Sequence, residues 1–231
     1  TSHRPAAVAT MNRRPCRVRP ARLRVALLLA ASAGTAHADA DEASLGVHVI
    51  GGAARLGEDG AGSASTVPLV GSGGRRTYAF HNAYAWEAAV AFATGTNASY
   101  ANFPDPAGGP AGALARTPRL ARLELGATAR FGVRYIPTLH AGLGTALRFR
   151  GGGDFTTFGQ TEEDALASEV VLDLVGVGGL GFDVRINRRW IAGTSIELRH
   201  AIPIGGPSFD SVEGFLHLSY YWYPRIFAFS D

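Results

Sequence analysis

The sequence contains one cysteine, one methionine and no lysine, and these scarcities limit what the chain can be. Cys16 lies in an arginine-rich N-terminal segment, so the rest of the chain can form no disulfide, thiolate metal site or cysteine nucleophile. All 22 basic residues are arginine. Beyond Ala38 the chain has 15 arginines and 19 acidic residues, which gives a net charge of −4. No basic cluster remains there, which argues against a nucleic-acid partner.

Long apolar runs are also missing. The run at residues 25–33 is shorter than the ~20 residues that a membrane-spanning helix requires. It follows six arginines between residues 13 and 24 and precedes Ala36-His37-Ala38, the order of a secretory signal peptide. We therefore expect residues 1–38 to comprise upstream residues and a cleaved signal peptide, and residues 39–231 to form one outer-membrane β-barrel domain.

Cleavage after Ala38 would leave Asp39 as the first residue of the mature protein. The intact mass of protein isolated from the cell envelope checks this expectation. Retention of the arginine-rich segment would contradict export.

Beyond Ala38 the recurring pattern is alternation of apolar and polar residues with period two, which is typical of strands with two different faces. It predicts eight strands, at about 44–54, 74–81, 86–95, 119–131, 137–149, 167–186, 190–201 and 211–223. Four connections are expected to be long: 55–73, 96–118, 150–166 and 202–210. The links between them are short. Strands of ~9–11 residues, with long loops at one end and tight turns at the other, are typical of bacterial transmembrane barrels.

The charged residues of the six later strands share one parity within each strand, and the opposite parity is apolar. Glycine and alanine occupy many of the other positions on the charged face, and such small residues suit the narrow interior of an eight-stranded barrel. We therefore predict an all-β fold, an eight-stranded antiparallel up-and-down transmembrane β-barrel with a charged lumen. Its predicted lumen charge network comprises Glu87, Glu124, Arg130, Arg148, Asp173, Asp183, Arg185, Glu197, Arg199 and Glu213, with Arg122 on the same face.

Buried charges need partners, so we expect these side chains to pair and to block flow through the lumen. Their positions suggest three pairs. Arg199 and Glu213 are nearly equidistant from the middle of the loop between the last two strands, Glu124 and Arg148 come close across the turn between the fourth and fifth, and Glu87 and Arg130 share a level near the periplasmic end.

Aromatic residues mark the ends of several predicted strands on the side of the short turns. A girdle at the periplasmic membrane interface would contain Phe80, Trp86, Phe131, Trp190 and Trp222. The alternative is that each ring packs in a core. Their matching positions favour the girdle.

The chain resembles the small eight-stranded outer-membrane barrels of the OmpA/OmpX type over residues 44–223, by pattern and topology. The resemblance implies insertion by the outer-membrane assembly machinery and a function carried by surface loops. One feature departs from it: these proteins usually end on an aromatic residue that closes the last strand, whereas here the chain continues past Tyr223 and Pro224.

Several sequence motifs that resemble functional sites have a simpler structural explanation. The glycines from Gly176 to Gly181 match a dinucleotide-binding pattern, but no helix is expected after them, so a bent strand explains them better. His200 resembles the catalytic histidine of outer-membrane lipid A deacylases, yet the serine expected two residues later is Ile202. Three further histidines point inward on separate strands and could bind a metal, although packed interior residues are the default: His48, His140 and His217. The acidic loop residues Asp154, Glu162, Glu163 and Asp164 could bind cations or simply be solvated.

The sequence thus predicts a monomeric, non-enzymatic protein of the Gram-negative outer membrane, in contact with its lipid and without cofactor. Its role would be structural or an interaction at the surface through four long extracellular loops, whose ligand the sequence does not identify. The alternatives are a narrow pore for small solutes or ions, a lipid-modifying enzyme and, last, a soluble periplasmic barrel.

Overall fold

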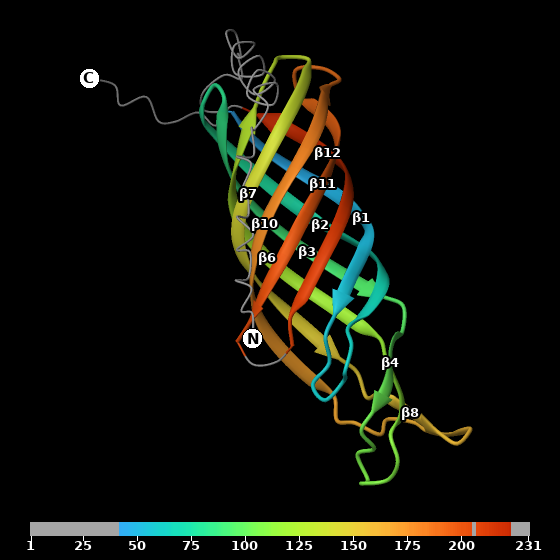
Figure 1. The fold of residues 1–231 in the computed structure, drawn as a ribbon. Helices are drawn as coiled ribbons and strands as arrows, with labels where there is room; N and C mark the ends of the chain where they lie inside the picture. The colour runs from blue at the N-terminus through green and yellow to red at the C-terminus, as the bar shows by residue number, and fades with distance from the viewer. Residues whose placement is uncertain (1–41, 205–206, 223–231) are drawn as a thin grey trace, which may run out of the picture. The chain divides into compact units, whose positions relative to one another are not determined.

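The computed structural model describes residues 42–204 and 207–222, where eight long antiparallel strands close into a barrel (Figure 1). The barrel strands are β1 (Ala43–Leu56), β2 (Ser65–His81), β3 (Tyr84–Gly95), β6 (Pro118–Arg130), β7 (Tyr135–Arg150), β10 (Glu169–Arg185), β11 (Trp190–Pro203) and β12 (Phe209–Trp222). The first and last of them, β1 and β12, pair along their whole length and close the ring. The predicted eight-stranded barrel is confirmed. The predicted signal segment and the chain after Trp222 lie outside the described residues.

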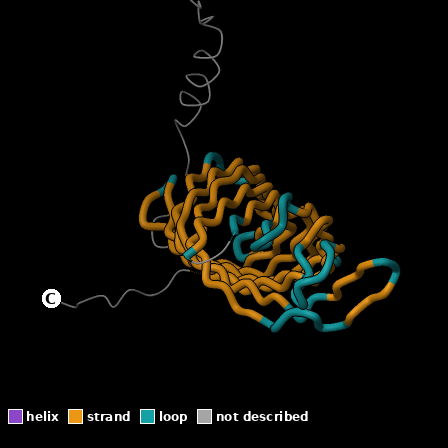
Figure 2. Tube along the Cα trace, turned by 60° about the horizontal axis from the view of Figure 1, so that its bottom comes forward, coloured by secondary structure: helices purple, strands orange, loops and turns teal. Residues whose placement is uncertain are grey.

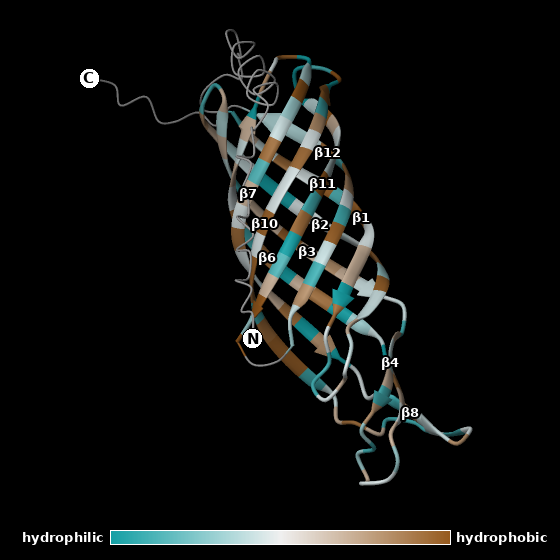
Figure 3. Ribbon diagram, in the orientation of Figure 1, coloured by the Kyte–Doolittle hydropathy of each residue, from teal (hydrophilic) through white to brown (hydrophobic). Residues whose placement is uncertain are grey.

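Hydrophobic and hydrophilic residues alternate along the barrel strands (Figure 3), and the exposed fractions show that the two kinds lie on opposite faces of the barrel. Large apolar residues point outward and are exposed, among them Leu143 at 74% and Leu216 at 64%. Charged residues point inward, where Arg122 and Glu213 are almost completely buried. A water-soluble barrel would have the reverse arrangement, so this exterior suits hydrocarbon. No helix in the described residues is long and apolar enough to cross a membrane.

Strand β2 begins at Ser65, nine residues before the predicted start, which corrects the expected loop at 55–73. The alternation was hidden by the glycines between Gly71 and Gly74. One of these glycines is required by its surroundings, because a Cβ at Gly73 would lie 2.5 Å from His48 Nε2 on the neighbouring strand. The residues that obscured the strand in the sequence therefore make room for side chains in the lumen.

Four long surface loops were predicted, and this prediction is wrong in two places. The connections after β1 and β11 are short, residues 57–64 and 204–208. The other two are long and form a second sheet of four strands in the order β4-β5-β8-β9: β4 (Ala98–Phe103), β5 (Gly112–Arg116), β8 (Asp154–Thr157) and β9 (Gln160–Glu162). Figure 2 shows the connections at this end of the ring of strands.

The second sheet is attached to the barrel by a shared apolar cluster. Tyr100, Leu114 and Phe155 from the small sheet are buried against barrel residues that include Leu69 and Phe209. The cluster lies at the end of the barrel with the long connections, called here the mouth. In bacterial barrels this end faces the outside of the cell.

Candidate functional site: a charged lumen and its mouth

Seven charged side chains from β2, β3, β6, β11 and β12 meet inside the barrel. This central network comprises Arg75, Glu87, Arg122, Glu124, Glu197, Arg199 and Glu213. All of them lie on the inward parity of their strands, so the backbone geometry alone directs them into the lumen. Charges that are removed from water must be paired there, and the distances show that they are.

Arg199 has the most ionic partners in the central network. Its Nε and Nη2 atoms donate to the two carboxylate oxygens of Glu124 at 2.7 and 2.9 Å, and Nη2 also donates to Glu197 at 2.6 Å. Its Nη1 lies 3.5 Å from Glu213. The guanidinium also lies over the Phe215 ring, 5.0 Å from the centroid.

Two further arginines complete the pairing of the central network. Arg122 binds Glu213 through two parallel hydrogen bonds, one of them 2.7 Å long, and both side chains are fully buried. Arg75 lies between Glu87 at 3.1 Å and Glu197 at 2.7 Å. The imidazole of His140 lies 3.4 Å from the carboxylate of Glu87, on the same inner face.

A second group closes the end of the lumen with the short turns. Arg185 lies 3.1 Å from Glu42, and Arg130 donates to the hydroxyl of Tyr221 at 2.5 Å. His217, on β12, lies 3.0 Å from Asp183 on β10. These contacts connect strands on different sides of the ring.

A third group, the mouth cluster, connects the barrel to the second sheet and comprises Glu58, Arg116, Arg148, Arg150 and Asp173. Glu58 accepts hydrogen bonds from Arg116 at 2.8 Å and Arg150 at 3.2 Å, and Arg148 pairs with Asp173 at 3.1 Å. Arg116 and Arg148 also donate to the carbonyl oxygens of Ala167 and Pro207. Residues from all four connections at the mouth thus contribute to one buried cluster.

The mouth cluster also affects Tyr100 of the second sheet. Burial, and then the carboxylate of Glu58, raise the pKa of Tyr100 to about 12, so its hydroxyl stays neutral at physiological pH.

The free space among these charges is small. A void of about 20 Å³ lies in the mouth cluster, and one of about 10 Å³ lies beside Glu87, Glu124 and Glu197. A water molecule needs roughly 10–15 Å³ of such space. These voids have room for single water molecules and not for a passing solute.

The structure places every residue of the predicted lumen network on the inner face of the barrel, but it changes two of the three predicted pairs. Arg199 and Glu213 are close, as expected. Glu124 binds Arg199 and not Arg148. Glu87 binds Arg75 and His140, while Arg130 turns to Tyr221 and lies 4.0 Å from Glu42.

Five charged members of these groups were not predicted: Glu42, Glu58, Arg75, Arg116 and Arg150. Four of them lie outside the predicted strands, where parity could not be assigned. Arg75 falls inside the predicted strand 74–81 but next to Arg76, so the sequence shows two adjacent charges and does not reveal which one points inward.

The predicted girdle residues lie near the short-turn end. Phe80 and Trp86 are exposed with ring centroids 5.2 Å apart, Trp190 is also exposed, and Phe131 and Trp222 are half-buried. Rings that were not predicted extend the group: Tyr84 stacks on Phe80, Tyr135 on Phe182, and Tyr220 contacts both Trp190 and Trp222.

The weaker motifs have structural explanations. The glycine run of β10 continues as a strand through Arg185. The three inward histidines do not gather at one site. His48 and His217 face each other in the register of β1 and β12, but His217 lies 3.0 Å from Asp183, and the ring of His48 packs against Phe215 with centroids 5.3 Å apart. His140 lies 3.4 Å from Glu87. Across the described ranges, no three His, Cys, Asp or Glu side chains are grouped to hold a metal ion.

No family model matches the chain, and no curated protein matches its sequence. Among solved structures, the chain is similar to the outer-membrane protein OprG from Pseudomonas aeruginosa, at 12% identity and a TM-score of 0.50, over 81% of this chain and 98% of that one. Ail of Yersinia pestis matches at 16% identity and a TM-score of 0.44, over 80% and 100% of the two chains. Neisserial surface protein A matches at 10% identity and a TM-score of 0.43, over 78% of this chain and 96% of that one.

The likeness to OprG is one of fold. The chain has the fold of the small eight-stranded outer-membrane barrels. Its apolar exterior and charged lumen are those of a barrel that spans a bilayer, and it is an integral protein of the Gram-negative outer membrane.

Proposed function

Starting from this membrane-spanning barrel, we propose that the protein is non-enzymatic and acts at the cell surface through the second sheet, β4-β5-β8-β9. The observation that carries the proposal is the way the sheet is built. It is formed by both long connections and fixed to the mouth by buried ion pairs at Glu58 and by the apolar cluster around Leu114. A surface that is held in one conformation loses less entropy on binding a partner than a flexible loop does.

The β8–β9 hairpin presents an exposed aromatic ring at its tip. Phe158 is 88% exposed and has a φ of 47°, a left-handed conformation that is costly for a bulky residue. Backbone strain of this kind is concentrated at functional sites, and exposed aromatic side chains are common anchors of interfaces. The tip is therefore the part of the sheet that we expect to contact a partner.

The charges around the tip suggest the chemistry of that partner. Four exposed acidic residues belong to the hairpin and its flank: Asp154, Glu162, Glu163 and Asp164. In the described connections at the mouth, Arg116 is the basic residue, and it is buried against Glu58. An acidic surface with one exposed ring favours a basic partner, because it attracts positive charge and offers a cation–π contact.

Replacing Phe158 with asparagine, which tolerates a positive φ, separates function from stability. We expect the free energy of unfolding to stay unchanged or rise by up to about 1 kcal/mol. Binding of an arginine-rich peptide to the barrel in nanodiscs should weaken roughly two- to fivefold through loss of the cation–π contact. Gln160→Ala at the same tip is the control and should change neither quantity. Loss of stability in Phe158→Asn would indicate that the ring is structural and would contradict the proposal.

The proposal includes a closed lumen, and the competing function is a narrow pore. Single barrels in planar bilayers should show little or no conductance, because the three charged groups fill the interior. Arg148→Ala removes a side chain that lines the 20 Å³ void and should leak more than the wild type. Large, stable currents from the wild type would make the pore the better proposal.

A lipid-modifying enzyme remains the third candidate, and one contact favours it. His200 Nδ1 lies 2.6 Å from the carboxylate of Asp210 on the outside of the barrel, an arrangement found in hydrolytic sites. The nucleophile that the deacylase pattern requires is replaced by Ile202. Purified protein should therefore release no fatty acid from phospholipid vesicles.

The proposal also includes insertion by the outer-membrane assembly machinery and a monomeric state. The closed ring supports the monomer, because it leaves no barrel edge to pair with a second copy.

A further inference from the structure

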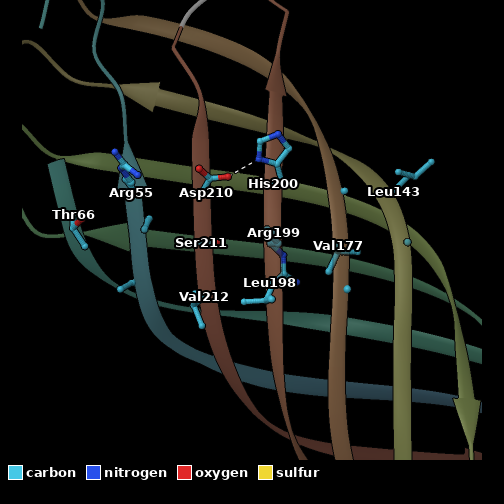
Figure 4. A pocket seen from close by; sticks show the side chains of 15 residues that line it. Arg55, Thr66, Leu143, Val177, Leu198, Arg199, His200, Asp210, Ser211 and Val212 are labelled. Carbon is cyan, nitrogen blue, oxygen red and sulfur yellow. Dashed lines mark hydrogen bonds and ion pairs between the residues drawn. The ribbon is translucent and has the colours of Figure 1, made fainter. Parts of the chain in front are cut away.

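A groove of about 720 Å³ lies on the outside of the barrel, across β10, β11 and β12 (Figure 4). Its floor is low because Gly176 and Gly178 occupy outward positions of β10, and a Cβ at Gly178 would meet nothing within 4 Å. Leu143 of β7 and Leu198 of β11, both more than half exposed, form its walls. The volume is within the range of roughly 300–1,000 Å³ that is typical of ligand sites.

One end of the groove is polar. Four outward residues lie side by side in the register of neighbouring strands: Thr66, Arg55, Asp210 and His200. Arg55 is the residue before the last of β1, at the mouth end, where a barrel meets the lipid headgroups. The groove therefore joins the hydrocarbon level beside Leu143 to the headgroup level at Arg55.

The cation at this end has no counter-ion among the residues that the structure describes. Asp210, which faces Arg55 in the register, is hydrogen-bonded to His200 at 2.6 Å, and the close view shows that contact beside the arginine (Figure 4). Arg55 is exposed and forms no hydrogen bond or ion pair with any described residue. A guanidinium matches the geometry of a phosphate and binds it through charge-assisted hydrogen bonds.

We propose that the groove is a binding site for an anionic phospholipid, with one acyl chain lying over Gly176 and Gly178 and the phosphate bound by Arg55. The hydroxyl of Thr66, the neighbour of Arg55 on β2, is placed to contribute a further hydrogen bond. Acyl chains leave a lipid environment to enter the groove, so the gain there comes from packing and not from the hydrophobic effect. The competing explanation is that the Arg55 side chain extends to any nearby lipid headgroup and that no acyl chain binds in the groove.

The test compares phosphatidylglycerol with a diacylglycerol that has the same acyl chains and no phosphate. Native mass spectrometry of the full barrel in detergent measures how tightly each lipid is retained. The wild type should retain phosphatidylglycerol about tenfold more tightly, and Arg55→Gln should remove this preference. Gly178→Leu fills the groove and should weaken both lipids about fivefold. Inorganic phosphate alone should not displace the lipid, because it uses only one end of the site.

Two control variants match these changes away from the groove. Arg188→Gln removes an exposed arginine in the turn after β10, and Gly51→Leu adds the same side chain on the outside of β1, where a Cβ also meets open space. Neither should change retention. If Gly178→Leu does not fold, Gly178→Ala takes its place. Equal retention in Arg55→Gln and wild type, or equal effects of Gly178→Leu and Gly51→Leu, would overturn the proposal.

Discussion

Replacing Arg199 with methionine should lower the free energy of unfolding of the barrel by about 3–5 kcal/mol. Methionine keeps an unbranched apolar chain in the same space but removes the charge. Three buried carboxylates lose this partner: Glu124, Glu197 and Glu213. Together with Glu87 they must then share the two remaining arginines of the central network. Glu124 is affected most, since its next arginine contact, Arg122, lies 3.9 Å away. A buried charge without a partner costs far more than an intact pair contributes.

Denaturant titration of the barrel in lipid vesicles measures this loss. Arg188→Met, in an exposed turn, is the control and should stay within about 0.5 kcal/mol of the wild type. The double variant Arg199→Met with Glu124→Gln should recover part of the loss, because it removes the carboxylate that is left unpaired. A single variant as stable as the control would mean that water, and not Arg199, neutralises the carboxylates of the central network.

The fold could be predicted from the sequence because most barrel strands bury one face and expose the other to a different solvent. In β6 and β7 this requirement leaves an uninterrupted alternation, with Leu123, Leu125 and Leu143 outward and charged or small residues inward. The alternation within a single strand is therefore enough to predict which of its residues face outward, whatever its neighbours are. Where a strand has glycines in place of inward side chains, as in β2, the pattern disappears although the strand does not.

The second sheet could not be predicted from this pattern. Its strands are short, as β9 (Gln160–Glu162) shows, and β8–β9 projects polar residues on both sides near its tip. What fixes them is contact with the barrel, through Arg116 at Glu58 and through buried Phe155. These contacts join positions far apart in the chain, and no local rule relates them.

The pairing of the lumen charges depends on the width of the barrel. The sequence suggested partners across hairpins, which holds for Arg199 and Glu213 on the adjacent strands β11 and β12. Arg122 instead binds Glu213 across the lumen, since β6 and β12 lie opposite each other in the ring of eight. The interior of an eight-stranded barrel is so narrow that long side chains reach the far wall. Partners therefore depend on strand order and tilt, which the alternation does not contain.

Replacing Leu143 with arginine should destabilise the barrel by about 2–4 kcal/mol, the cost of a cation at a lipid-facing position near the middle of the bilayer. Leu143 lies near the centre of β7 and is 74% exposed, so nothing in the protein can shield the new charge. Leu147→Arg on the same face, nearer the mouth, is the matched variant. Its guanidinium can reach the headgroups, and the cost should fall to about 0–1 kcal/mol.

The difference between the two variants carries the information, because both add the same side chain to the same face of the same strand. Unfolding titrations in vesicles of one lipid composition give both losses on one scale. A larger loss at Leu143 than at Leu147 requires a medium whose polarity changes along the strand, which a bilayer provides and water does not. Small and equal losses would mean that the exposed leucines face water, and the soluble periplasmic barrel would then explain the chain better than a membrane protein.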